Sequence, residues 1–90
     1  MAEDIYANLR EKLIEQGGWP QPYMFKFIIP SDNKKLAQVE AVFGEDAEVT
    51  TRQSKSNKYI SITAKEVMIS PEEVINTYKK AEGIKGLMSL

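Results

Sequence analysis

The sequence contains no cysteine and no histidine. Without cysteine the chain cannot form a disulfide framework, so nothing in its composition points to secretion. The two absences together exclude the common zinc sites, a thiol nucleophile and a serine–histidine relay. Catalysis would have to rest on carboxylates, lysine, arginine or tyrosine, and we expect neither a metal nor any other cofactor.

Long apolar runs are also missing. The N-terminal stretch "MAEDIYANLREKL" carries acids where a signal peptide needs a basic flank before an apolar run. No window approaches the length that spans a membrane. We therefore expect a cytoplasmic protein that does not engage a membrane. Its net charge of -1 gives no overall attraction to nucleic acid or to anionic lipid.

The composition is that of a soluble globular protein, since 42% of the 90 residues are hydrophobic and 28% are charged. A chain of this length forms one domain and has little interior left for a deep cleft. We therefore look for function on a surface.

Helical spacing is present at the N-terminus. Ile5, Tyr6, Leu9 and Leu13 recur at helical spacing in a segment from Asp4 to Gln16, until two glycines stop the pattern. This predicts an amphipathic helix whose apolar stripe packs on protein. We assign residues 1–18 to this helix and its Gly-Gly tether.

Strict alternation marks the first strand, "YMFKFIIP". Phe25 and Phe27 share one side with Tyr23 and Ile29, while Lys26 lies on the other side. The aromatic side should therefore be core, and Lys26 should face water.

The remaining elements follow from caps and turn residues. Ser31 is a plausible N-cap for a helix that runs to about Phe43, and "SPEE" from Ser70 is a strong helix start. Between them, residues 48–54 and the alternating "YISITAK" predict a hairpin, with Asn57 left-handed in its turn. The apolar "IKGLMSL" at the C-terminus predicts a final strand.

The predicted order after the first helix is β-α-β-β-α-β over residues 19–90. Right-handed crossovers then give a four-stranded antiparallel sheet with both helices on one face, in spatial order 4-1-3-2. The fold class is α+β, a ferredoxin-like sandwich with an N-terminal lead-in helix.

Several stretches resemble, in order and spacing, the YbeD-like family of small bacterial proteins of unknown function. They are "WPQPYMFKF", "RQSKSNKYISIT", "VINTYKK" and the C-terminal "LMSL", within residues 19–90. The resemblance implies the ferredoxin-like fold and a comparison with ACT regulatory domains, hence regulation linked to a ligand or a protein. It brings no catalytic residues. Asn57 stands where the family commonly has glycine, and the lead-in helix is longer than usual.

Three functions are open to this fold. RNA recognition motifs stack bases on exposed sheet aromatics, but here Phe25 and Phe27 face the core and only Tyr59 is left. An acylphosphatase-type enzyme needs an anion-cradling loop with arginine after the first strand, where this sequence has "PSDNKK". A small non-catalytic regulatory or adaptor module needs only a surface. We favour this module, with nucleic-acid binding as the alternative.

The candidate surface is the helix-free face of the sheet and the 52–65 hairpin. Cations, hydroxyls and one ring there suit a protein partner or a small anionic metabolite. The opposing interpretation is a hairpin that charge keeps soluble and protected from sheet pairing. We expect a monomer or a weak homodimer. The candidate residues are Lys26, Arg52, Ser54, Lys55, Lys58, Tyr59, Ser61 and Lys65.

Overall fold

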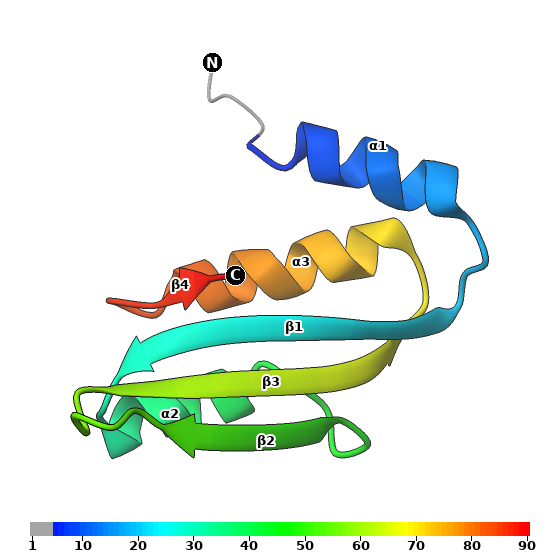
Figure 1. The fold of residues 1–90 in the computed structure, drawn as a ribbon. Coiled ribbons are helices and arrows are strands. Elements are labelled where there is room, and N and C mark those ends of the chain that lie inside the picture. Colours follow the sequence, from blue (N-terminus) through cyan, green and yellow to red (C-terminus); the bar gives the residue numbers. More distant parts are fainter. Residues whose placement is uncertain (1–4) are drawn as a thin grey trace.

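The structure is a computed structural model that describes residues 5–90 (Figure 1). Its four-stranded sheet has the order β2-β3-β1-β4, which is the predicted ferredoxin-like α+β arrangement. No helix within residues 5–90 is long and apolar enough to cross a membrane. The elements are α1 (Ala7–Gln16), β1 (Gln21–Pro30), α2 (Asn33–Glu40), β2 (Glu48–Gln53), β3 (Tyr59–Met68), α3 (Pro71–Glu82) and β4 (Met88–Ser89).

The two faces of β1 differ as its alternation predicts. Phe25, Phe27 and Ile29 are buried, whereas Met24 and Lys26, at the alternate positions, are exposed. A one-residue shift in register would exchange the two sets, so the burial of the aromatic residues determines the register of the whole sheet.

Both crossover segments cover the aromatic face. The ring of Phe25 packs against Phe43, which follows α2, and against Tyr78 of α3, with centroid distances of 5.4 and 5.1 Å. Val39 of α2 and Ile75 of α3 are buried in the same cluster. The core therefore lies between one face of the sheet and the two helices.

β3 lies in the middle of the sheet and pairs antiparallel with both β1 and β2. Its buried residues Ile60 and Ile62 lie opposite Ile29 and Phe27 of β1. This confirms the predicted inward side of the return strand. The hairpin turn between β2 and β3 also forms as predicted, with Asn57 in the left-handed region at φ 59°.

The predicted limits of the second helix were wrong. Asp32, and not Ser31, is the N-cap, because its Oδ1 accepts hydrogen bonds from the amides of Lys34 and Lys35 at 2.8 and 3.3 Å. The helix ends at Glu40 rather than near Phe43. Asp and Ser cap about equally well, so adjacent candidates cannot be separated by residue type.

The final strand is much shorter than the seven-residue apolar stretch suggested. β4 contains only Met88 and Ser89, which pair with Ile28 and Phe27 of β1. The preceding residues form a turn, in which Gly86 adopts a positive φ of 85°. Ile84 goes into the core instead of the strand.

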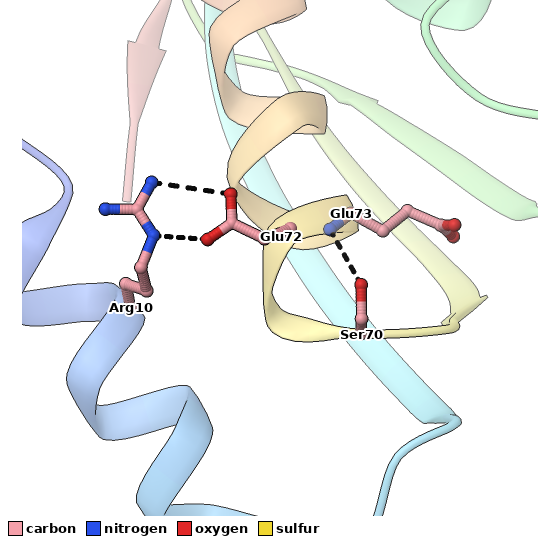
Figure 2. Close-up of polar contacts among 4 residues, drawn as sticks. All are labelled: Arg10, Ser70, Glu72 and Glu73. Carbon is pink, nitrogen blue, oxygen red and sulfur yellow. Dashed lines mark hydrogen bonds and ion pairs between the residues drawn. The ribbon is translucent and has the colours of Figure 1, made fainter.

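The start of α3 is as predicted. The Ser70 hydroxyl accepts a hydrogen bond from the Glu73 amide at 3.3 Å (Figure 2). The Glu73 carboxylate in turn accepts one from the amide of Ile69 at 3.4 Å. Pro71 occupies the first helical position, where its missing N–H leaves no donor unpaired.

α1 lies alongside α3 (Figure 1) and adds to the core from outside the crossover helices. Leu13 is buried, and its carbonyl accepts a hydrogen bond from the Trp19 indole at 3.0 Å. Arg10 forms an ion pair with Glu72 of α3 (Figure 2). The N-terminal helix is therefore packed within its own chain.

The lead-in helix is shorter than its spacing suggested. It begins at Ala7, and Ile5 is 74% exposed, so this residue is not part of the packed stripe. Asp4, where we expected the helix to begin, lies outside the described residues. Tyr6, from the same predicted set, does pack: its ring stacks on Tyr78 at 6.2 Å and its hydroxyl donates to Glu82.

The sidedness of β1 gives a first prediction. Phe27→Ala should lower the free energy of unfolding by about 3 to 5 kcal/mol, because it removes a fully buried ring. Lys26→Ala, one residue away on the exposed side, should change it by about 0.5 kcal/mol or less. Urea denaturation of the two variants checks this. Equal losses would contradict the register.

The Tyr6 hydroxyl predicts a pH dependence. Burial and the hydrogen bond to Glu82 raise the pKa of Tyr6 from 10.0 to about 12. The folded state therefore holds this proton more tightly. The protonated Tyr6 hydroxyl stabilises the fold fully below the pKa of the unfolded state, and this contribution is lost as the pH rises through the pKa of the folded state. Between about pH 9 and about pH 12, wild type should lose more free energy of unfolding than Tyr6→Phe. Equal losses in urea denaturation would mean that folding does not raise the pKa of Tyr6.

Candidate functional site

The face of the sheet opposite α2 and α3 carries polar side chains from the three long strands. They come from alternate positions, each pointing away from the core. We call this surface the open face. Its polar members are Lys26, Glu48, Thr50, Arg52, Ser61, Thr63 and Lys65.

The strand register brings two predicted cations close to two hydroxyls. Arg52 of β2 lies opposite Ser61 of β3, and Lys26 of β1 lies opposite Thr63 of β3. Neighbouring strands are about 4.8 Å apart, so these four side chains form one group across three strands. A hollow in the surface is lined by this group together with Thr50 and Leu90.

The electrostatics of the open face favour anions. Lys26, Arg52 and Lys65 are exposed, and no residue of the described chain forms an ion pair or hydrogen bond with their side chains. Glu48 is the acid on this face, opposite Lys65 at the far end of β2. The other strand acid, Glu66, faces the opposite side and accepts a hydrogen bond from the Gly44 amide at 2.9 Å.

The hairpin tip carries two more of the predicted cations. Lys55 and Lys58 are exposed, and the Lys58 carbonyl accepts a hydrogen bond from the Ser31 amide at 2.9 Å. The tip is thus tied to the end of β1. Its lysines lie at one end of the open face and extend it, outside the hollow between Lys26 and Arg52.

Ser54 lies one residue past the end of β2, which finishes at Gln53, and it continues the alternation of Thr50 and Arg52 because its amide donates to the Tyr59 carbonyl. It is half-buried, and its hydroxyl accepts a hydrogen bond from the Tyr59 amide at 3.1 Å. A serine in "QSKSNK" caps the turn locally because its short side chain reaches the nearby backbone.

Tyr59 is on the open face, as its alternation with Ile60 predicts, and is 47% exposed. It lies opposite Pro30 at the hairpin end of β3, while Lys65 lies near the other end of the same strand, opposite Met24. The ring therefore flanks the hollow and is not part of its lining.

Thr50 and Leu90 line the hollow but were not among the candidate residues. Thr50 could have been found, because it is two positions from Arg52 and shares its face. Leu90 could not, because its place depends on the register of the short β4: its amide donates to the Lys26 carbonyl at 2.9 Å. Its side chain is 74% exposed, which gives the hollow an apolar border.

A second hollow lies on the helix side, near the end of α2 and along α3. Its lining mixes acids and bases, including Glu66, Glu73, Lys79 and Lys80. Glu66 and Glu73 already accept backbone hydrogen bonds there. The two acids of this hollow balance its two bases, whereas Lys26 and Arg52 give the hollow of the open face a net positive charge.

Comparison with known proteins agrees with the resemblance in the sequence. No curated protein matches this chain, and no solved structure does. A family model described as a protein of unknown function (DUF493) matches residues 15–89, which is the whole sheet and both crossover helices. Most of α1 precedes the match. Because the match covers most of the sequence, the chain belongs to the DUF493 family, the YbeD family of unknown function.

Proposed function

We propose that this protein is a small, non-catalytic regulatory or adaptor module of the cytoplasm that binds an anionic group on the open face. The observation that carries the proposal is the pair Lys26 and Arg52, two exposed cations on neighbouring sides of β3 that have no acidic partner within residues 5–90. The regulatory part of the proposal also draws on the resemblance to ACT domains.

The chemistry of the hollow suits a carboxylate or a phosphate. Arginine offers a planar fork that matches either anion, and lysine adds a point charge on the opposite side. The Ser61 and Thr63 hydroxyls lie between them on β3 and can donate further hydrogen bonds. The anionic group can be carried by a small metabolite or by an acidic segment of a partner protein.

Nucleic-acid binding is the weaker candidate. Base stacking needs exposed aromatic rings, and Phe25 and Phe27 are buried under the helices. Tyr59 offers a ring at the edge of the cationic surface, beside the lysines of the hairpin tip. Single-stranded RNA is therefore a comparison ligand in the test below.

The test titrates ¹⁵N-labelled protein with citrate and with pyrophosphate while its amide resonances are followed. We expect the largest shifts at Arg52, Ser61 and Thr63. Lys26→Glu should weaken binding by about tenfold or more, because a hydrogen bond to a charged group contributes about 1.5 to 3 kcal/mol. Lys79→Glu on α3 is the matched control and should bind as wild type does.

A second experiment tests for a protein partner: wild type, Lys26→Glu and Lys79→Glu are each used for affinity capture from a cytoplasmic extract. A partner retained by wild type and Lys79→Glu, but lost with Lys26→Glu, supports the adaptor form of the proposal. Capture that is independent of Lys26, together with shifts confined to the helix side, would overturn it. Binding of single-stranded RNA in preference to both anions would favour the nucleic-acid alternative.

A further inference from the structure

The two edges of the sheet differ in their capacity to accept another strand. At the β1 edge, β4 covers only two residues of β1. The uncovered part of β1 contains Pro22, which has no N–H to donate to another strand. At the other edge, β2 presents six residues, Glu48–Gln53, without proline. Natural sheets protect such edges, because a row of unpaired backbone groups is a template for pairing.

The direction of the free backbone groups follows from the hairpin. The Ser54 amide donates to the Tyr59 carbonyl at 2.9 Å, so Ser54 and the alternate residues Arg52 and Thr50 direct their backbone groups to β3. The intervening Val49 and Thr51 direct theirs outward. Within the described residues, no hydrogen bond reaches either of these two amides.

We infer that β2 pairs antiparallel with β2 of a second copy of this chain, with Thr50 opposite Thr50 across a two-fold axis. In this register the outward groups of Val49 meet those of Thr51 in the second copy, so backbone hydrogen bonds form at each of these pairs. The two four-stranded sheets then join into one of eight strands. This inference does not depend on the proposed ligand.

The charges of β2 select this register and this partner. Glu48 and Arg52 lie on the open face, two residues either side of Thr50. In the two-fold pairing, Glu48 of each copy lies opposite Arg52 of the other. These are non-hydrogen-bonded positions, where cross-strand side chains are closest. Sliding one β2 by two residues in either direction also keeps the outward backbone groups facing each other. Neither of these two registers places Glu48 opposite Arg52.

The joined sheet has a consequence for the open face. Each Glu48 would lie between Lys65 of its own β3 and Arg52 of the second copy, in an alternating row across the junction. The Lys26 side of each hollow remains free, since β1 is two strands away from the junction. The dimer is weak because edge pairing buries little surface, so it depends on protein concentration.

Cysteine cross-linking tests the register directly, since the natural chain has no cysteine. In the inferred dimer the two Thr50 residues form a non-hydrogen-bonded pair, whose Cβ atoms are about 4.5 Å apart, within reach of a disulfide. Mild oxidation should therefore link most of the Thr50→Cys protein into dimers. Arg52→Cys is the matched control. In the inferred register, residue 52 of one copy lies opposite residue 48 of the other, so the two cysteines would be four residues, or about 13 Å, apart and should stay unlinked.

Reversing the charges of Glu48 and Arg52, first singly and then together, tests whether these two residues pair across the junction. Sedimentation velocity over a range of concentrations should show dissociation constants raised about tenfold in Glu48→Arg and in Arg52→Glu, because each change replaces two ion pairs with two repulsions. The double variant should recover the wild-type value. Lys26→Glu should not change it.

Three outcomes overturn the inference. The first is a protein that stays monomeric at millimolar concentration. The second is a dimer that cross-links through residue 52 and not through residue 50. The third is a dimer that the single charge changes leave intact, since its interface would then lie elsewhere.

Discussion

The alternation of side chains along β1 determines which face of the sheet becomes core. Phe25 and Phe27 contribute the rings that pack against Phe43 and Tyr78, and removing them from water is the main driving force that attaches both helices to one face. Lys26, one position between them, is then turned to water. The same period of two carries Arg52, Ser61 and Thr63 to that face through the pairing of three strands.

The parts of the fold that the sequence predicted are those with several concordant signals. β1 alternates from Tyr23 to Ile29 and β3 from Tyr59 to Lys65, and the start of α3 combines Ser70, Pro71 and Glu73. The parts that it did not predict are of two kinds. In one, two adjacent residues suit the same role about equally well, and in the other, the outcome depends on which strands pair in the folded sheet. Ser31 and Asp32 are both good caps, and the sheet pairs only two residues of the apolar C-terminal stretch.

The candidate surface shows the same division. Lys26, Arg52, Tyr59, Ser61 and Lys65 follow strand alternation, so their common face could be predicted. Ser54 follows the same alternation one residue past β2, but its local role could not be predicted: its hydroxyl accepts a hydrogen bond from the Tyr59 amide. Leu90 borders the hollow only through the pairing of β4 with β1, which no local pattern encodes.

We propose that free cations on the open face, and not those on the helices, meet the ligand. Lysine-reactive footprinting of the whole chain, with and without pyrophosphate, distinguishes the two surfaces. We expect Lys26 to lose reactivity on ligand addition while Lys79 and Lys80 on α3 keep theirs. Protection of Lys79 and Lys80 with Lys26 unchanged would contradict this proposal and move the site to the helix side.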